Sequence, residues 1–575
     1  MTITELFNKF FQEKTKKIVN NLPPSNRRPR QAVRVQEKEF RTVTTREIRR
    51  HILSLNNSKA EGIDTISNVL VKAGSTIIAP YLRGIVNNCI RLSYFPETWK
   101  IGKINVTHKK NSKQEMNNYR PVTILSSLSK VIEKVLFKQI LEHFQDHGLL
   151  DERQYGFRPG RSCTQAVLDY INTVLHEKQG EENKVNSLLI DLSAAFDIVD
   201  HKTLLEKLKR YGLGLRARTL MKSYLERRKV FTEIEIGRST LTNVDYGVPQ
   251  GSILGPLLYI IYVTDIKDLD EYSKICYADD TTVLVKARDM QRLEERTNEA
   301  MRNIISYFAG EGLKLNSDKT ELLNHNGRDV EVETDDRGNK QKSSKHARLL
   351  GIIIDSNLNF QNHIELLVKD VEYRLWLFKK ISKTAGLRSR LLYAYGILFS
   401  KFVYGINCYA GAGVVYMEKV RVAYDRCVRM TYGRNPEGKS TEQMRDELEI
   451  LSLGNLVKMQ DVLVFGKIIH TGRPENLKRY INTNRGRDTR SNSTRSVQIT
   501  TIPRTEKLRS SFLFRASRTW NSLPETLRDF SKSQYKEKLK LYFLGRFDVD
   551  AERFDAAGRS GPTAAGSPPS SPINY

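Results

Sequence analysis

Cysteine is scarce in this chain. Only five occur among 575 residues, and no two have the close spacing of a zinc knuckle or ribbon: Cys89, Cys163, Cys276, Cys408 and Cys427. Their odd number and scattered positions argue against a disulfide framework and favour a reducing, intracellular environment. We expect them to behave as small buried hydrophobic residues.

Long apolar runs are also missing. The most apolar stretch, 257–263, is far shorter than the roughly 20 residues needed to span a bilayer. The first residues, Met1 to Phe7, lack the apolar core of a signal peptide. The sequence therefore predicts a protein without a membrane partner.

Acidic residues are outnumbered. The chain has 66 Asp and Glu against 94 Lys and Arg, a formal net charge of +28. An excess of this size favours a polyanionic partner, most commonly nucleic acid, and the competing interpretation is a merely basic, soluble surface.

The length predicts more than one domain, each large enough to have its own core.

One pair of acids has an unusual setting. Asp279 and Asp280 lie in the run 275–285 (ICYADDTTVLV), where apolar, β-prone residues flank them and predict strand, tight turn and strand. By contrast, Asp335 and Asp336 lie in a polar stretch that predicts a solvated loop. Two carboxylates at a hairpin tip repel each other unless cations lie between them. Two divalent metal ions that clamp a phosphoryl transfer would supply those cations.

A third acid has a matching position. The segment 187–191 (SLLID) is an apolar strand that ends on Asp191, and Asp197 follows shortly afterwards. A palm-type metal site needs one carboxylate from a strand end and others from a neighbouring hairpin. The combination is far more specific than either part alone.

The chain divides by composition into segments of different character. Thr44 and Glu47 have capping-box spacing and predict a helix through Ile48, Ile52 and Leu55. From 100 to 360 the pattern is mixed α+β, and afterwards it is mostly helical and basic. In chain order we expect a basic, largely flexible segment (1–44), a helical extension (45–99), a catalytic region (100–360), a helical region (361–481), a basic linker (482–500), a small unit around Trp520 (501–547) and a disordered tail (548–575).

Seven blocks then occur in a fixed order. They are 118–125 (NYRPVTIL), 154–158 (QYGFR), 189–197 (LIDLSAAFD), 247–252 (GVPQGS), 277–280 (YADD), 312–316 (GLKLN) with Lys319 and Thr320, and 349–352 (LLGI). From about residue 45 to about residue 545 the chain resembles the reverse transcriptase of a non-LTR retrotransposon, a LINE-type, Jockey-like element.

The resemblance implies an α+β, right-hand polymerase fold. Fingers would occupy 90–190 and 200–250, the palm would surround Asp191 and the 275–285 hairpin, and a helical thumb would follow residue 360. The implied activity is that of an RNA-directed DNA polymerase (a nucleotidyltransferase), which copies the RNA of a transposable element from a primer 3′-hydroxyl.

The resemblance also implies partners and a location. The partners would be an RNA template, a DNA primer in nicked target DNA, and dNTPs, with RNA binding and DNA binding both expected. The protein would act in a cytoplasmic ribonucleoprotein and in the nucleus. No segment before residue 50 is long enough for an endonuclease, so we expect that domain to be encoded upstream.

The resemblance assigns the metal ligands. Asp191, Asp279 and Asp280 would hold two Mg²⁺ ions, with Mn²⁺ as a substitute, although Asp280 has the alternative role of orienting its neighbour. Lys319 would be a general acid near the pyrophosphate, or else only a surface lysine. Asp197 is expected to be structural.

It also assigns substrate contacts. Arg120 would bind the triphosphate, and Lys109 or Lys110 would assist, with a solvated basic loop as the competing interpretation for the two lysines. Phe196 would be a steric gate against the 2′-hydroxyl, or a core residue that closes the turn. Gln250 and Gly251, in a Gly/Pro turn before a helix expected to start near Ser252, would approach the nucleotide closely. Primer and template contacts fall on Tyr277 and on Gly351, in a strand beside the palm.

Two alternative functions remain. One is a maturase-like or cellular reverse transcriptase, which a self-splicing intron around the gene would favour. The other is a domesticated RNA-binding remnant without polymerase activity, against which the intact Asp191, Asp279 and Asp280 argue.

Overall fold

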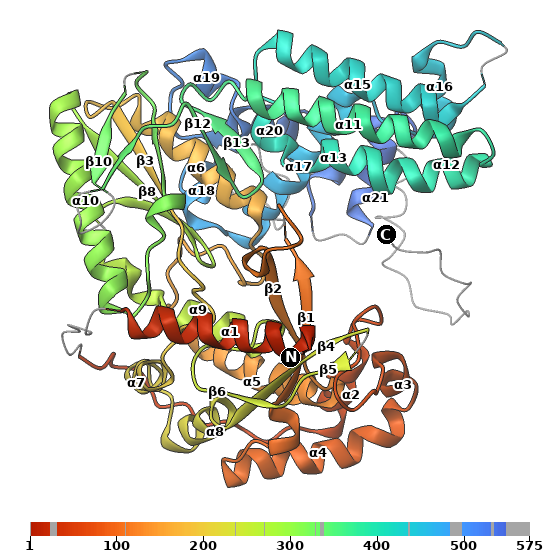
Figure 1. Ribbon diagram of the computed structural model, residues 1–575. Coiled ribbons are helices and arrows are strands. Elements are labelled where there is room, and N and C mark those ends of the chain that lie inside the picture. Colours follow the sequence, from red (N-terminus) through yellow and green to blue (C-terminus); the bar gives the residue numbers. More distant parts are fainter. Residues whose placement is uncertain are drawn as a thin grey trace, which may run out of the picture. The chain divides into compact units, whose positions relative to one another are not determined.

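The computed structural model has two compact units (Figure 1). It describes residues 2–22, 31–109, 111–235, 237–269, 271–327, 329–333, 339–434, 437–483, 497–530 and 534–547. Unit 1 comprises Met1–Ala166 and Glu177–Leu349, and unit 2 comprises Val167–His176 and Leu350–Tyr575. Within the described ranges, no helix is both long and apolar enough to cross a membrane.

Unit 1 mixes helices and strands. Its helices are α1 (Ile3–Asn20), α2 (Thr45–Leu53), α3 (Asn68–Ala73), α4 (Ser75–Leu92), α5 (Ser127–Asp146), α7 (His201–Arg210), α8 (Leu215–Leu225), α9 (Leu254–Tyr262) and α10 (Met290–Gly310), with α6 (Cys163–Glu177) shared between the units. Its strands are β1 (Ile101–His108), β2 (Tyr119–Ile124), β3 (Lys184–Ile190), β4 (Arg228–Ile234), β5 (Gly237–Arg238), β6 (Thr242–Val244), β7 (Ser273–Tyr277), β8 (Asp280–Ala287), β9 (Glu321–Asn324), β10 (Glu331–Glu333), β11 (Lys340–Lys342) and β12 (His346–Leu349). The α+β prediction for this region is confirmed.

Two sheets organise unit 1. The first has four antiparallel strands in the order β7-β8-β3-β9, and the predicted 275–285 hairpin is its β7-β8 pair. The second has the order β2-β1-β4-β5, with β6 also paired to β4, and its β1-β4 pair is parallel. Helices α5 and α9 contribute fully buried apolar side chains to the core.

Helix α9 begins at Leu254, two residues later than predicted. Its first amides are capped from another helix, since a carboxylate oxygen of buried Glu133 in α5 accepts hydrogen bonds from the amides of Ile253 at 2.7 Å and Leu254 at 3.2 Å. Pro256 lies in the first turn, where its missing N–H breaks no helical bond. The turn 247–252 is thereby anchored to the core.

Helix α1 is a feature that the sequence did not predict. Phe7 and Phe11, one turn apart, are buried against Ile104 of β1 and Val230 of β4. Thr2 caps the first turn, since its hydroxyl accepts a hydrogen bond from the amide of Glu5 at 3.3 Å. The many lysines of this stretch hid a short apolar face that contacts the second sheet.

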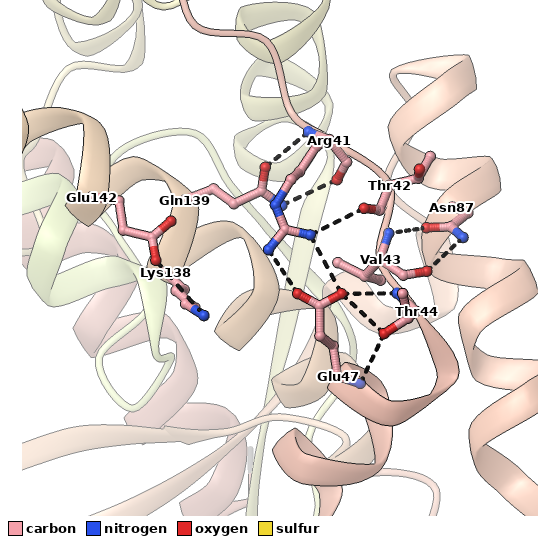
Figure 2. Close-up of polar contacts among 9 residues, drawn as sticks. All are labelled: Arg41, Thr42, Val43, Thr44, Glu47, Asn87, Lys138, Gln139 and Glu142. Atoms are coloured by element: carbon pink, nitrogen blue, oxygen red, sulfur yellow. Dashed lines mark hydrogen bonds and ion pairs between the residues drawn. The ribbon is translucent and has the colours of Figure 1, made fainter.

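The predicted capping box is confirmed at α2 (Figure 2). The Thr44 hydroxyl accepts from the Glu47 amide at 3.2 Å, and the Glu47 carboxylate accepts from the Thr44 amide at 2.9 Å. Arg41 adds a hydrogen bond to the same carboxylate at 2.6 Å. The side chain of Gln139 in α5 forms hydrogen bonds with the backbone of Arg41, and that of Asn87 in α4 with the backbone of Val43. These contacts attach the segment before α2 to both helices.

We expect Glu47→Gln to weaken α2 locally by about 1 kcal/mol at neutral pH. The hydrogen bond from Arg41, and then that from the Thr44 amide, lower the pKa of Glu47 to about 2. A lowered folded-state pKa means that this stabilisation is present above pH 4.5 and is lost as the pH falls toward 2.

Hydrogen exchange of the α2 amides measures this effect. The wild type should lose protection between pH 4.5 and 2, and the variant should show a flatter profile there. Glu142→Gln is the matched control, because Glu142 forms an exposed ion pair of 3.7 Å with Lys138 and its charge is the weakest of the effects that act on Arg41 (Figure 2). Equal pH profiles for Glu47→Gln and wild type would contradict the assignment.

Unit 2 is mostly helical. Its elements are β13 (Ile352–Asp355), α11 (Gln361–Ser382), α12 (Leu387–Tyr393), α13 (Ser400–Val403), α14 (Ile406–Tyr409), α15 (Val414–Tyr432), α16 (Thr441–Leu448), α17 (Leu453–Thr471), α18 (Glu475–Lys478), β14 (Ile481–Thr483), β15 (Val497–Ile499), α19 (Glu506–Arg509), α20 (Phe512–Ser522) and α21 (Tyr535–Phe543), with a π-helical turn at Ala394–Phe399. Buried Asp461 of α17 binds Arg515 of α20 at 3.1 Å and Asn407 of α14 at 2.8 Å. Trp520 is buried against Phe465 and is therefore a core residue of this unit.

Several expectations concern other parts of the chain. Four of the five cysteines are buried as predicted, and Cys163 is half-buried. Asp335, Asp336, the tail from 548 and most of the predicted linker 482–500 lie outside the described residues. The predicted domain boundaries stay predictions.

Candidate active site

The three candidate metal ligands come together at one end of the four-stranded sheet. Strands β3 and β8 are antiparallel, and their last pair at this end is Ile190 with Thr281. One step further in the same register lie Asp191 and Asp280, on neighbouring strands. Asp279 occupies the two-residue turn between Tyr277 and Asp280, which pair directly. The strand end and the neighbouring hairpin therefore supply the carboxylates as the sequence pattern predicted.

Hydrogen bonds to the Gln154 side chain stabilise the turn that carries Asp279. The side-chain carbonyl of Gln154 accepts hydrogen bonds from the amides of Ala278 at 2.9 Å and Gly156 at 2.8 Å. Ala278 has a positive φ of 59°, a conformation that non-glycine residues seldom adopt without such support. The backbone of Tyr155 adds a hydrogen bond to Cys276 at 2.7 Å. The segment 154–156 thus fixes the shape of the hairpin tip.

Asp191 is held by the segment that follows α10. The Asn316 side chain donates to a carboxylate oxygen of Asp191 at 3.0 Å, and the Asn316 amide donates to the Asp191 carbonyl at 2.9 Å. The ammonium of Lys319 lies 3.4 Å from the same carboxylate oxygen. The lysine expected near the leaving group is therefore adjacent to a candidate metal ligand.

The carboxylates perturb one another. Desolvation, and then the charge of Asp191, raise the pKa of Asp279, against the effect of Arg120 and Lys109. Desolvation and the charges of Asp279 and Asp191 raise the pKa of Asp280 to about 6, although its side chain reaches solvent. Arg120 is an exposed residue of β2, and its charge lowers the pKa of both Asp279 and Asp280. Lys110 lies outside the described residues.

Phe196 packs against two other aromatic side chains. Its ring stacks on Tyr259 of α9 with centroids 4.3 Å apart and planes at 27°, and meets the edge of Phe157 at 5.9 Å. Tyr259 is completely buried. The side chain of Phe196 itself is only half-buried, so part of it is accessible to solvent. Both expected roles, closing the turn and forming a gate, agree with this placement.

Gln250 and Gly251 make close contacts with neighbouring backbone. The Gln250 side chain donates a hydrogen bond to the Asp197 carboxylate at 2.7 Å. The backbone carbonyl of Gln250 accepts a hydrogen bond from the Thr123 amide at 2.7 Å. Gly251 has φ of +114°, and a Cβ there would lie 2.2 Å from the Thr123 carbonyl oxygen. Burial raises the pKa of Asp197 to about 6, and its partner is Gln250, which agrees with a structural role.

The strand expected around Gly351 is interrupted. Strand β12 ends at Leu349 and β13 begins at Ile352, with positive φ values of 47° at Leu350 and 86° at Gly351 between them. The prediction that Gly351 lies within a strand is therefore wrong, because this glycine makes a turn. Within unit 2, the Tyr404 hydroxyl donates to the Leu350 carbonyl at 2.6 Å and holds that turn.

The donor set fits a hard divalent cation. Carboxylate oxygens are the ligands that Mg²⁺ prefers, and a bound cation would oppose the desolvation and the acid–acid repulsion that raise the pKa values of Asp279 and Asp280. Backbone register places Asp191, Asp279 and Asp280 at one sheet end, but among the described residues no three His, Cys, Asp or Glu side chains are arranged as a metal site.

Two residues at the site have no role in the sequence-based assignment. Gln154 and Asn316 lie within the motif blocks 154–158 and 312–316, and their occurrence in these blocks was the available signal. Their hydrogen bonds join residues more than 100 positions apart and are visible only in the folded chain. Lys109 was expected, like Lys110, to assist in binding the triphosphate, and its charge acts on Asp279 and Asp280.

A polymerase-like carboxylate site on a mixed α+β unit now has independent support. Residues 107–354 match the family described as reverse transcriptase (RNA-dependent DNA polymerase). These residues therefore form a reverse transcriptase domain, and it contains all three candidate metal ligands.

Relatives narrow the class. The chain is 29% identical to a probable RNA-directed DNA polymerase from transposon X-element of Drosophila melanogaster, over 70% of this chain and 45% of that protein. It is 28% identical to a probable RNA-directed DNA polymerase from transposon BS, over 68% of this chain and 44% of that protein. It is 26% identical to an RNA-directed DNA polymerase from mobile element jockey, over 78% of this chain and 52% of that protein. Both relatives are from the same species. The chain spans about half the length of these relatives. These similarities agree with the resemblance to LINE-type, Jockey-like reverse transcriptases that the motifs predicted.

Proposed function

We propose that this chain is an RNA-directed DNA polymerase that copies the RNA of a non-LTR retrotransposon from a primer 3′-hydroxyl. The observation that carries the proposal is the meeting of Asp191, Asp279 and Asp280 at one sheet end within the matched domain. Unit 1 would provide fingers and palm, and the helices after residue 360 would provide a thumb. Template RNA, primer DNA and dNTPs would be its substrates, in a cytoplasmic ribonucleoprotein and in the nucleus.

The residues have distinct parts in the proposed reaction. Asp191, Asp279 and Asp280 would hold two Mg²⁺ ions, with Mn²⁺ as a substitute; when bound, these lower the pKa of the primer hydroxyl and neutralise the triphosphate. Arg120 would bind phosphate oxygens, and Lys319 would donate a proton to the leaving pyrophosphate. Gln250 and Gly251 would form the floor beneath the nucleotide, and Tyr277 would contact the primer.

Primer extension tests the proposal directly. The purified chain is incubated with an RNA template, an annealed DNA primer, dNTPs and Mg²⁺, and a parallel reaction contains excess EDTA. We expect extension only without the chelator. RNA binding without extension under any divalent-ion condition would instead support an RNA-binding remnant.

We expect Gly156→Ala to slow extension by about 100-fold. A Cβ at Gly156 would lie 2.3 Å from the Ala278 amide nitrogen, so the turn that carries Asp279 would have to move. The matched control is Gly84→Ala in helix α4, where a Cβ meets nothing within 4 Å. Extension rates of the two variants decide the point, and equal rates would show that the turn tolerates the displacement.

A further inference from the structure

The Gly/Pro turn before α9 lies directly against the segment that carries Phe196. The Val248 amide donates a hydrogen bond to the Phe196 carbonyl at 2.9 Å. The Gly247 amide donates to the Val199 carbonyl at 2.8 Å. Gly247 has φ of +82°, and a Cβ there would lie 2.7 Å from the Asp197 carbonyl oxygen, so no side chain fits between the two segments. The two segments therefore form one structural unit.

A side-chain hydrogen bond crosses the same contact. Nε2 of Gln250 donates to Oδ1 of Asp197 at 2.7 Å. Burial raises the pKa of Asp197 to about 6, so its carboxylate is ionised at neutral pH and only accepts hydrogen bonds. The carboxylate therefore selects the nitrogen end of the Gln250 amide. Among the described residues the Gln250 side chain has no second hydrogen bond, so its oxygen, Oε1, remains unpaired.

Direct contacts connect this unit with the carboxylate hairpin. The Phe196 ring meets the Phe157 ring with centroids 5.9 Å apart. The amide of the preceding Gly156 donates to the side-chain oxygen of Gln154, and the same oxygen accepts from the amide of Ala278 in the hairpin turn. A continuous series of contacts therefore joins the Gly/Pro turn to the turn of the candidate metal ligands.

We propose that Asp197 is a positioning residue for nucleotide binding, whose carboxylate orients the Gln250 amide so that its oxygen faces the incoming dNTP as a hydrogen-bond acceptor. The inference rests on the proposed polymerase function, in which Gln250 approaches the nucleotide. Asp197 makes no contact with substrate and acts only through Gln250. Without an ionised acceptor at position 197 the amide would adopt either of its two orientations, and one of them would present the NH₂ group to the nucleotide in place of the oxygen.

A double-mutant cycle on this pair tests the proposal in the full chain. Asp197→Asn keeps the size of the side chain and offers either a donor or an acceptor, whereas Gln250→Glu places two carboxylates face to face. The double variant restores one donor and one acceptor with the original net charge. Single-nucleotide extension gives kcat and KM for dNTP.

We expect KM to rise about fivefold in Asp197→Asn and about 50-fold in Gln250→Glu, with kcat within about threefold in both. The double variant should come within about threefold of the wild-type KM, because the new amide at position 197 again fixes an oxygen toward the nucleotide. The control is Asp245→Asn, which removes an exposed charge shortly before the same turn and should match wild type.

An unchanged KM in Asp197→Asn, or losses that simply multiply in the double variant, would overturn the proposal. Recovery of folding in the double variant, measured by near-UV circular dichroism, without recovery of dNTP affinity would also overturn it, since Asp197 would then be structural only. Binding of dNTP in Ca²⁺ to the chain on a dideoxy-terminated primer needs no extension. It compares the same variants even if an inactive wild type contradicts the polymerase function, and a wild type that binds no dNTP would overturn both.

Discussion

Asp279→Asn should abolish primer extension, with a loss of about 10³-fold or more in kcat. The substitution keeps the size of the side chain and removes the charge at the centre of the carboxylate group. Asp279 stands in the turn between β7 and β8, where Gln154 fixes the backbone independently of the Asp279 side chain. The effect should therefore be chemical rather than structural.

The comparison needs two further variants. Asp146→Asn, at the exposed end of α5, loses the same charge away from the site and should extend primers at the wild-type rate. Asp280→Asn should lose less activity than Asp279→Asn if Asp280 mainly orients its neighbour. Affinity for template RNA, measured by filter binding, should be equal in all three. Substantial extension by Asp279→Asn would remove this residue from the proposed metal site.

Local sequence patterns predicted the centre of the site well, for a physical reason. Apolar, β-prone residues on both sides of Asp279 require a hairpin, and an apolar strand ending at Asp191 needs a partner of the same kind. Antiparallel pairing of the two then brings the acids together. The capping box at Thr44 was predictable for a similar reason, since both partners lie within one helical turn.

Features that depend on distant contacts were not predictable. Helix α1 lies in a lysine-rich stretch of ordinary apolar content, and its stability comes from packing Phe7 and Phe11 on strands more than 90 residues away. The supporting role of Gln154 depends on a hydrogen bond to Ala278, 124 residues further along. The turn at Gly351 was predicted as strand because apolar residues surround it, and its left-handed backbone is the feature that apolar patterning does not report.

Phe196→Val should allow ribonucleotides into the site. A bulky ring below the sugar excludes a 2′-hydroxyl by collision, so its loss should lower the ratio of kcat/KM for dNTP over rNTP by about 100-fold. The ring cannot easily turn aside, because Tyr259 supports its face and Phe157 its edge. Extension with dNTP should stay within a few-fold of wild type, since no hydrogen bond is removed.

Variants that keep or loosen the ring test the gate. Phe196→Tyr should preserve discrimination, and so should Tyr259→Phe, which keeps the stacked ring beneath it. Tyr259→Leu removes that support from a fully buried position, so it should give an intermediate ratio by letting the Phe196 ring tilt. An unchanged dNTP-to-rNTP ratio in Phe196→Val would leave Phe196 as a core residue that closes the turn after Asp191. Sugar selection would then have to come from the backbone around Gln250 and Gly251, the other part of the site that we propose to approach the nucleotide.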